Sequence, residues 1–577
     1  MNRREFMGAA AMAPLASFQG RPNVIVLLTD DQGYGDLSCH GNPVLKSPEL
    51  DKLHGESIRF TDFHVAPMCT PTRGQLLSGQ DALHNGATSV TAGRALLRRG
   101  LPTMADVFSA GGYSTGLFGK WHVGDCYPYR PMERGFQEAN YFHGFGMSSV
   151  PEFDNDYFNG RYRHNGISQR FSGYCTDFWF GQAIEWMRAR QSRREPFFCY
   201  LPTNIPHGPT WVDEKYAAPY RKPGLPAAFF GMIANLDENV GKLEAFLRTS
   251  GLRENTLLIY MTDNGGTGGV PVFNAGMRGR KTQLWEGGHR VPCFVRWPAG
   301  RLRKPGGICV PAQIQDLLPT LIDLCGLKRP DRAQFDGTSL AGLLKGSADK
   351  LADRMMVVQY GQILKKWESC VIWNQWRLVN GTELHDIHAD PGQKNDVAAG
   401  NAGVVKKMRD HYEQWWDRVE PGLREFAPIS IGAAQANPVT LTSSDWEEVY
   451  CDNMNNLLSG AGGPQGGPWS VFVERDGEYE IALRRWPVEG DLPLNAPCPA
   501  KKLTVAALPA GKAFPIAGAR LKIAGQDLTA SAATGEKATL FRVRLKGGVK
   551  THLHGWFQDA AGADLCGAYY AYVRRLG

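Results

Sequence analysis

The N-terminal two-thirds of the chain alternates short apolar runs with longer amphipathic stretches. The runs at residues 23–29 (NVIVLLT), 197–201 (FFCYL) and 256–262 (TLLIYMT) are almost wholly apolar, which is typical of parallel strands buried on both faces of a sheet. Between the last two runs, apolar residues recur at helical spacing from Ile233 to Leu247. This alternation predicts an α/β fold with a doubly wound, mostly parallel sheet.

The pattern changes after residue 350, so we expect the α/β domain to span residues 21–350. Short alternating segments followed by an amphipathic stretch predict a small antiparallel subdomain with one helix at residues 351–425. After a linker with little periodicity, residues 436–577 alternate again and contain an Asp-Gly turn between two strands. This tail predicts a C-terminal all-β module of the sandwich type.

The first twenty residues, MNRREFMGAAAMAPLASFQG, have the order of features found in an export signal. Arg3 and Arg4 are followed by a short Ala-rich apolar stretch and by small residues near Ala13 and Ala16. Residues 1–20 therefore predict a twin-arginine signal, read by the twin-arginine export machinery of a bacterium. The expected location of the mature protein is the periplasm or the medium beyond it.

Composition narrows the class of protein without naming a function. The 577 residues are 43% hydrophobic and 21% charged, with a formal net charge of +7, which is mild for this length and compatible with an anionic substrate rather than nucleic acid. No run of 18 apolar residues occurs, so no membrane span is expected. The twelve cysteines include no C-x-x-C pair, which argues against a zinc ribbon or a thioredoxin motif.

Oxygen-bearing side chains follow two of the predicted strands. Asp30 and Asp31 come directly after the first run, and Asp263 and Asn264 come directly after the run at residues 256–262. Carboxyl ends of parallel strands meet at one edge of a sheet, where ligands bind. A set of hard oxygen ligands favours calcium, with magnesium as the alternative, over zinc or copper.

Basic side chains accompany that predicted metal site. They occur after other strand ends or in Gly-rich stretches, and a single lysine or histidine of this kind is by default a surface or structural residue. Together they predict a pocket for a tetrahedral oxyanion ester, in which two histidines could act as acid and base near neutral pH. These residues are Arg73, Lys120, His122, His207 and Lys281.

The stretch PMCTPTRGQLLSG, residues 67–79, leaves two interpretations open. Cys69 lies four residues before Arg73, with Pro71 at a good first position of a helix. The thiol could be a small core residue. Alternatively, a helix N-terminus beside a guanidinium would favour a negative charge on the side chain of residue 69, either as a thiolate or as an oxyanion formed on that side chain.

The stretch CTPTRG resembles the signature of the type I sulfatases, and six further separated motifs match that family in its order. The six are NVIVLLTDDQGYGDLSCHGNP, GKWHVG, PHGP, TDNGG, RGRKTQLWEGGHRVP and DGTSLAGLL. The resemblance covers about residues 22–420 and implies the alkaline phosphatase-like fold and the hydrolysis of sulfate monoesters. It also implies that a maturation enzyme oxidises Cys69 to formylglycine.

Carried over by position, the resemblance implies a role for each candidate residue. Formylglycine 69 would be hydrated to a gem-diol, would contact the metal, and would attack sulfur with help from Arg73. His207 would protonate the leaving oxygen, Lys120 and Lys281 would hold sulfate oxygens, and His122 would take the proton that allows sulfate to be expelled. The metal would be bound by Asp30, Asp31, Asp263, Asn264 and residue 69.

Two other functions remain as alternatives, and the substrate is open. A phosphate or phosphonate ester hydrolase of the same superfamily would use a similar pocket, and a catalytically silent glycan-binding protein would use the β module. Export and the β module favour a sulfated carbohydrate as substrate. Residues 125–166, rich in aromatic and charged side chains, either line substrate subsites or form an ordinary surface loop. His552 and His554 could form a metal pair but fit an exposed strand better.

Overall fold

The computed structural model describes residues 20–153, 155–331 and 333–577. The predicted twin-arginine signal, apart from Gly20, therefore lies outside the described residues. Among the described helices, none combines the length and the apolar character that a membrane span requires.

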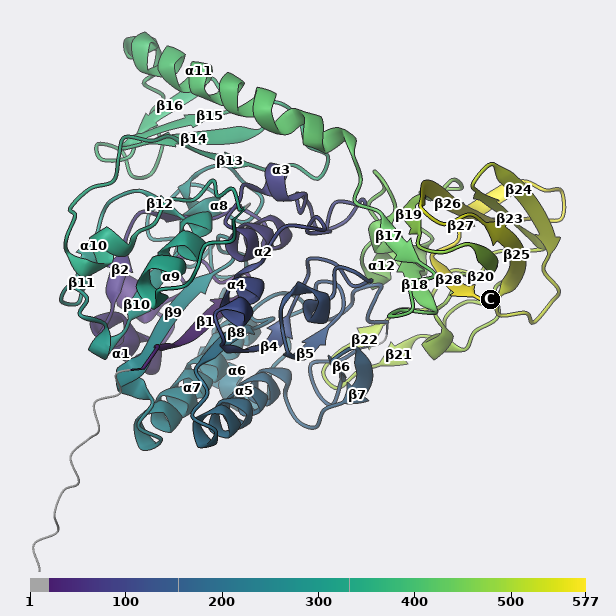
Figure 1. Ribbon diagram of the computed structural model, residues 1–577, viewed down its shortest axis with the longest axis horizontal. Coiled ribbons are helices and arrows are strands. Elements are labelled where there is room, and N and C mark those ends of the chain that lie inside the picture. Colours follow the sequence, from purple (N-terminus) through teal and green to yellow (C-terminus); the bar gives the residue numbers. More distant parts are fainter. Residues whose placement is uncertain (1–19, 154, 332) are drawn as a thin grey trace, which may run out of the picture.

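A ten-stranded sheet forms the centre of the N-terminal domain (Figure 1). β1 (Asn23–Thr29) lies between β8 (Phe197–Pro202) and β9 (Thr256–Thr262) and runs parallel to both. β4 (Ser114–Lys120) and β5 (Glu138–Phe142) continue in parallel beyond β8. This confirms the predicted fold class, with antiparallel pairs added toward both edges. The outer strands are β11 (Gly306–Ile308), β2 (Ile58–Phe60), β10 (Cys293–Arg296), β6 (Arg161–His164) and β7 (Ile167–Arg170).

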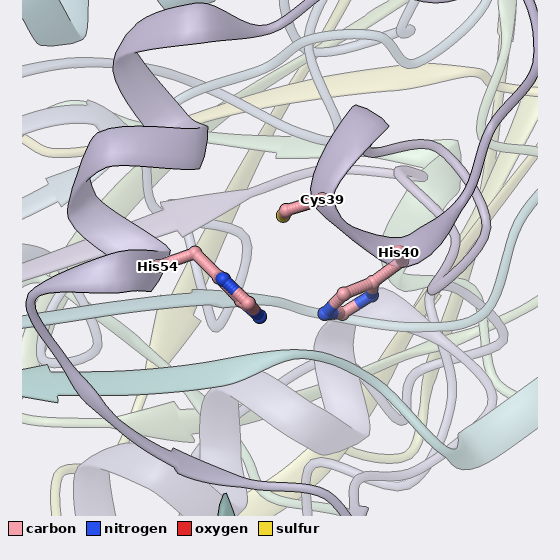
Figure 2. A group of neighbouring side chains, drawn as sticks. All are labelled: Cys39, His40 and His54. Atoms are coloured by element: carbon pink, nitrogen blue, oxygen red, sulfur yellow. The ribbon is translucent and has the colours of Figure 1, made fainter. Parts of the chain in front are cut away.

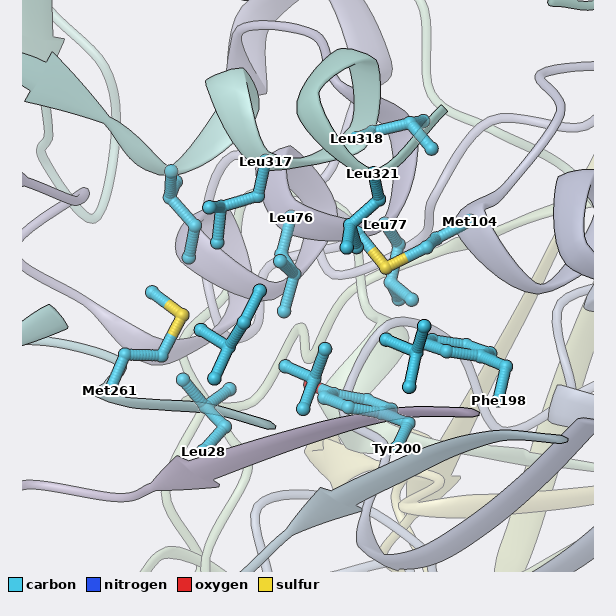
Figure 3. Close-up of a cluster of buried hydrophobic side chains, with 14 of the residues drawn as sticks. Leu28, Leu76, Leu77, Met104, Phe198, Tyr200, Met261, Leu317, Leu318 and Leu321 are labelled. Carbon is cyan, nitrogen blue, oxygen red and sulfur yellow. The ribbon is translucent and has the colours of Figure 1, made fainter. Parts of the chain in front are cut away.

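The central strands are apolar throughout because helices cover both faces of the sheet. Along β1, Val24, Val26 and Leu28 pack into one core, whereas Ile25 and Leu27 pack into the other. Each fully buried side chain of this size contributes roughly 2 kcal/mol to folding. The first face is covered by α2 (Cys69–Ser78), α4 (Met104–Ala110) and α9 (Leu317–Cys325) (Figure 3). The second face is covered by α1 (Pro48–Gly55), α5 (Cys175–Ser192) and α7 (Ala227–Thr249).

A second, four-stranded antiparallel sheet follows in the chain, consisting of β13 (Met356–Gln359), β14 (Ser369–Trp373), β15 (Trp376–Val379) and β16 (Glu383–Asp386). The long helix α11 (Ala402–Val419) packs on it (Figure 1). Tyr412, Trp415 and Trp416 supply the helix side of that contact.

The C-terminal β-rich region contains two large sheets that share one core, and a two-stranded sheet of β21 (Lys501–Lys502) and β22 (Ala507–Leu508). The Asp-Gly sequence links β19 to β20, but these strands belong to opposite sheets, so it does not close a hairpin: β19 pairs with β26, and β20 pairs with β25 and β28. One sheet contains β17 (Ile429–Ile431), β19 (Trp469–Val473), β26 (Val549–Gln558), β23 (Gly518–Ile523), β24 (Gln526–Ser531) and β27 (Asp564–Gly567). The other contains β18 (Val439–Thr442), β28 (Tyr570–Arg575), β20 (Gly477–Arg484) and β25 (Thr539–Leu545).

The β-rich region is joined to the α/β domain by a continuous apolar contact. Leu96, Tyr129 and Val150 of the α/β domain are buried in the core of the β sheets. The hydroxyl of Tyr570 in β28 also donates to the carbonyl of Val150 at 2.9 Å. Figure 1 shows β17, β18 and the short helix α12 (Met454–Ser459) on the side that faces the α/β domain.

Candidate active site

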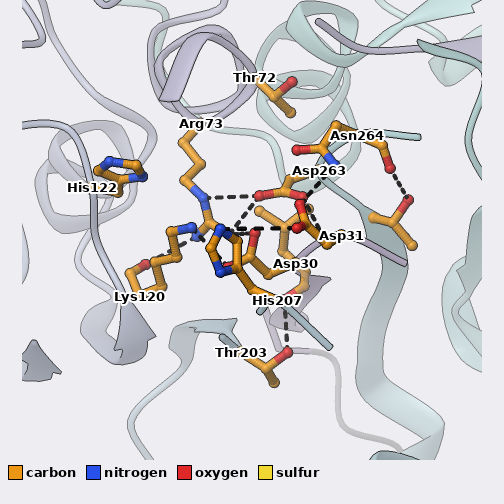
Figure 4. Close-up of polar contacts among 12 residues, drawn as sticks. Asp30, Asp31, Thr72, Arg73, Lys120, His122, Thr203, His207, Asp263 and Asn264 are labelled. Carbon is orange, nitrogen blue, oxygen red and sulfur yellow. Dashed lines mark hydrogen bonds and ion pairs between the residues drawn. The ribbon is translucent and has the colours of Figure 1, made fainter. Parts of the chain in front are cut away.

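The four predicted oxygen ligands lie together at the carboxyl ends of β1 and β9 (Figure 4). The amide of Asn264 donates to Asp31 Oδ1 at 3.0 Å, and the backbone N–H of Asp31 donates to Asp263 Oδ1 at 3.2 Å. All are buried, with at most 4% exposure. Two oxygens, Asp30 Oδ1 and Asn264 Oδ1, are buried without a hydrogen-bond partner.

These residues fit a hard divalent cation. Burial and the negative charge of Asp30 raise the pKa of Asp263 to about 7, although Arg73 lies against it. Carboxylates this close are stable in the ionised form only when a cation compensates them. Ligand atoms of Asp30, Cys69 and Asp263 lie within 4.8 Å of one another, so one ion could contact all three. Because most of the ligand atoms that the protein offers there are oxygens, calcium or magnesium suits the site.

Three basic side chains surround the carboxylates and are held by them. Lys120 Nζ lies 2.7 Å from Asp30 Oδ2, and Arg73 contacts Asp263 Oδ2 at 2.8 Å. Lys281 forms an ion pair with Asp31. Burial opposes the charge of Lys281, but Asp31 and the other acidic groups around it together outweigh burial, and the pKa of this lysine rises. The pocket therefore presents fixed positive charges to an anionic group.

His207 lies in the loop after β8 and reaches the same cluster. Its Nε2 is 3.8 Å from Asp31 Oδ2, and 19% of its side chain is exposed. Nδ1 donates to the carbonyl of Gly208 at 2.6 Å, which leaves Nε2 as the atom that faces the site. The hydroxyl of Tyr157 anchors the loop by donating to the His207 carbonyl at 2.8 Å. Burial lowers the pKa of His207, and Asp31 only partly offsets this.

His122 follows β4 in a left-handed backbone conformation, with φ of 60°. Thr70 fixes this turn, because its hydroxyl donates to the His122 carbonyl at 3.0 Å. Nδ1 of His122 is buried without a partner. Burial and the charge of Lys120 hold the pKa of His122 well below its usual value. The ring is therefore neutral near pH 7, as a proton acceptor must be.

Cys69 is the first residue of α2 and is 1% exposed. Burial raises the pKa of its thiol, although Lys120 and Lys281 act in the opposite direction. The raised pKa therefore does not support a thiolate at Cys69. Position 69 remains next to the carboxylate cluster, with Tyr360 packed beside it.

Phe145 belongs to the site although no motif indicated it. Its ring lies 5.4 Å from the ring of His207 and 6.3 Å from that of His122, measured between centroids. It comes from the aromatic-rich residues 125–166, so part of that segment does approach the site. The only available sequence signal was the segment's composition.

Another group of possible metal ligands, which contains two histidines, lies apart from the carboxylates. Cys39, His40 and His54, from the 3₁₀ turn Ser38–His40 and from α1, come within reach of one ion (Figure 2). However, burial and Asp51 raise the pKa of the Cys39 thiol to about 12, so it is not a ready metal ligand.

In the β-rich region, the two histidines proposed as a conceivable metal pair have separate partners. His552 lies 3.1 Å from Glu447, and His554 Nε2 donates to the carbonyl of Gln465 at 2.8 Å.

The fold and the site define a hydrolase of sulfuric esters in the alkaline phosphatase superfamily. Residues 22–327 match the Sulfatase family, and the chain belongs to that family. N-acetylgalactosamine-6-sulfatase of Mus musculus is 27% identical over 500 residues, covering 76% of this chain and 92% of the relative. Arylsulfatase G of Mus musculus is 30% identical over 379 residues, covering 57% of this chain and 70% of the relative.

Solved structures give the same result. The crystal structure titled Ps i-CgsB in complex with k-i-k-neocarrahexaose has 27% sequence identity and a TM-score of 0.63, covering 69% of this chain and 93% of that one. The resemblance to type I sulfatases inferred from the motifs is confirmed.

Proposed function

We propose that this sulfuric ester hydrolase removes sulfate from a carbohydrate, using formylglycine formed from Cys69. The observation that carries the proposal is the convergence of position 69, at the start of α2, with the carboxylate cluster and with Lys120 and Lys281. A sulfate ester brought to that point would meet a nucleophile, positive charges and two histidines at once.

Substrate binding depends on the basic side chains. Lys120 and Lys281 are aligned by Asp30 and Asp31, so each ammonium group is fixed before the substrate arrives. They would hold the non-bridging sulfate oxygens. His207 Nε2, on the other side of the carboxylates, would face the bridging oxygen.

The proposed reaction has two steps. In the first, one hydroxyl of hydrated formylglycine 69 gives its proton to the neighbouring carboxylate of Asp263 and attacks sulfur, the bond from sulfur to the bridging oxygen breaks, and His207 delivers a proton to the departing alcohol. In the second, His122 takes the proton of the remaining hydroxyl, the bond from the formylglycine carbon to the sulfate oxygen breaks, and sulfate leaves. Water then rehydrates the aldehyde. Arg73 supports the nucleophile's oxygen with its positive charge.

A divalent cation would be held by Asp30, Asp31, Asp263 and Asn264 and would supply positive charge that stabilises the oxygen anions of the site. We propose calcium, with magnesium as the alternative, because the protein donors are oxygens. The unpartnered buried oxygens of Asp30 and Asn264 support this assignment.

The carbohydrate part of the proposal is supported by the relatives. One is named for N-acetylgalactosamine 6-sulfate, and one structural relative holds a neocarrahexaose. Export into the periplasm or the medium, read by the twin-arginine machinery from residues 1–20, would bring the enzyme to polysaccharides outside the cell. Conversion of Cys69 by a maturation enzyme would then have to occur before export of the folded protein.

The test is sulfate release from a panel of monosulfated galactose, N-acetylgalactosamine and glucosamine glycosides, together with an aryl sulfate and an aryl phosphate. Mass spectrometry of the tryptic peptide that contains residue 69 measures formylglycine in the same sample. Cys69→Ala should abolish sulfate release, whereas Cys309→Ala, at an exposed cysteine, should not change it. Faster release of phosphate than of sulfate would favour the phosphate ester alternative, and full activity with an unconverted thiol would overturn the nucleophile.

A further inference from the structure

The C-terminal β-rich region sends one segment, residues 443–453, across to the active site. The segment is attached to the α/β domain at both of its ends. The hydroxyl of Thr91 donates to the carbonyl of Ser444 at 3.1 Å, and the backbone N–H of Val150 donates to the carbonyl of Asp452 at 2.8 Å. A hydrogen bond of 2.9 Å from Ser443 Oγ to the Cys451 carbonyl closes the segment into a loop. These contacts give the loop a fixed position relative to the catalytic residues.

The loop forms one wall of a small cavity whose opposite wall contains His122. The cavity is narrow, and both polypeptide regions are needed to close it. Its lining residues from the α/β domain include His122, Asp125 and Phe145, and those from the loop are Ser444, Asp445 and Asp452.

Polar atoms in this cavity have no partner within the protein. Ser444 Oγ and His122 Nδ1 are each buried, with residue exposures of 9% and 4%, and neither makes a hydrogen bond. Asp125 Oδ1 is also buried without a partner, while its other oxygen accepts from the backbone N–H of Gly144 at 2.8 Å. Buried polar atoms are normally hydrogen-bonded. A group from outside the protein that both donates and accepts, such as a hydroxyl, would supply hydrogen bonds to these three atoms.

Asp445 lies close enough to Asp125 to influence its ionisation. Burial and the neighbouring Asp445 raise the pKa of Asp125 to about 8, and burial raises the pKa of Asp445 to about 7. Burial also raises the pKa of Asp452 to about 6. A carboxyl that keeps its proton offers both a donor and an acceptor, which suits a sugar hydroxyl. Ionised carboxyls in the same cavity are unfavourable for an anion.

We propose that Asp125, Ser444, Asp445 and Asp452 form a subsite that binds a hydroxyl group of the sugar next to the reacting sulfate and disfavours a second anionic group there. This subsite rests on the proposed function, because it lies beside His122 and acts on the same substrate. It gives the β-rich region a role in substrate selection. A site that hydrogen-bonds a hydroxyl rejects analogues without one by leaving its own buried groups unpaired.

The test compares each monosulfated glycoside of the panel with its analogue that carries a second sulfate on the neighbouring hydroxyl. We expect the wild-type enzyme to prefer the monosulfated member at least tenfold in kcat/KM. Asp445→Asn should lower that preference at least fivefold, and it should raise KM for the monosulfated glycoside. Asp491→Asn, at an exposed aspartate paired with Lys537 in the same β-rich region, is the matched control and should leave both values unchanged.

A second variant keeps the test decisive if Asp445→Asn does not fold. Ser444→Ala removes only the unpartnered hydroxyl and should raise KM about threefold or more on the monosulfated glycoside. Equal rates of the wild type on the mono- and disulfated members, or unchanged values in folded variants, would overturn the subsite while leaving sulfate release intact. No sulfate release from any member, the aryl sulfate included, would instead overturn the proposed function and the subsite with it.

Discussion

Replacing Arg377 tests how the small antiparallel sheet is joined to the domain that carries the active site. This side chain, in β15, is fully buried. It pairs with Asp62 at 2.8 Å and with Glu286 of α8 (Glu286–His289) at 2.7 Å. Arg377→Met nearly keeps the volume of the side chain but removes the charge, so two buried carboxylates each lose their buried guanidinium partner and keep only His64 beside Asp62 and Arg290 beside Glu286 among the described ion pairs. Breaking a buried pair in this way costs about 3–5 kcal/mol.

The pKa of Glu286 makes this stability depend on pH. Burial would raise that pKa, but Arg377 together with the neighbouring His64 and His289 outweighs burial and lowers it from 4.5 to about 2. A lowered carboxylate pKa means that this stability is present above about pH 4.5 and is lost as the pH falls toward 2. A difference of this size corresponds to about 3 kcal/mol for all the charges around Glu286 together, of which Arg377 is one.

The assay is urea unfolding of the wild type and variant at pH 7 and at pH 4. We expect the variant to lose about 3–5 kcal/mol at pH 7 and a smaller amount at pH 4, because Glu286 takes up a proton in the unfolded chain below about pH 4.5 and the stability that its ionised form gives the wild type then begins to fall. Arg424→Met is the control, because this arginine is exposed and pairs only along its own helix with Glu420; it should cost about 0.5 kcal/mol or less. A loss below about 1 kcal/mol for Arg377→Met, or no coupling with Glu286→Gln in a double-mutant cycle, would refute the reasoning.

Three further results are expected. We expect calcium to raise the melting temperature of the wild type, by about 2.7 kcal/mol of stability at a hundred times the dissociation constant, and Asp263→Asn should remove that rise; equal metal content by elemental analysis would contradict the ligand assignment. His207→Ala should slow release from a sugar sulfate about 10²- to 10⁴-fold but affect an aryl sulfate far less, whereas Lys281→Ala should weaken both alike; equal losses for His207→Ala would remove its role as acid. Cys69→Ser should show no formylglycine by peptide mass spectrometry when produced with a maturation enzyme specific for cysteine, and activity equal to wild type would exclude formylglycine as the nucleophile.

Much of the fold could be predicted because its central strands are buried on both faces. A strand in that position has no polar side to interrupt the apolar run, so residues 23–29 and 256–262 are recognisable without any neighbour. The residues directly after such strands are also set by local chain direction. That is why Asp30, Asp31, Asp263 and Asn264 could be expected at one edge of the sheet, and the structure brings them together there.

Features that depend on contacts between distant segments could not be predicted in the same way. The Asp-Gly sequence at residues 476–477 has the local chemistry of a turn, but which sheet each flanking strand joins depends on β26, β25 and β28, far along the chain. The partners of Arg377 are likewise 315 and 91 positions away. Local pattern carries no information about such pairs.

The same distinction explains how the active site is divided along the chain. Most residues proposed to act on the sulfate group lie at or after the ends of buried strands of the α/β domain, and their motifs are short and local. The loop at residues 443–453, by contrast, comes from the β-rich region and reaches the cavity through contacts with Thr91 and Val150. The residues proposed to act on the sulfate group therefore belong to the α/β domain, whereas the β-rich region supplies the loop proposed to contact the sugar. If Asp445→Asn alters the choice between mono- and disulfated glycosides and His207→Ala alters only the dependence on the leaving group, the two regions carry separate parts of the function.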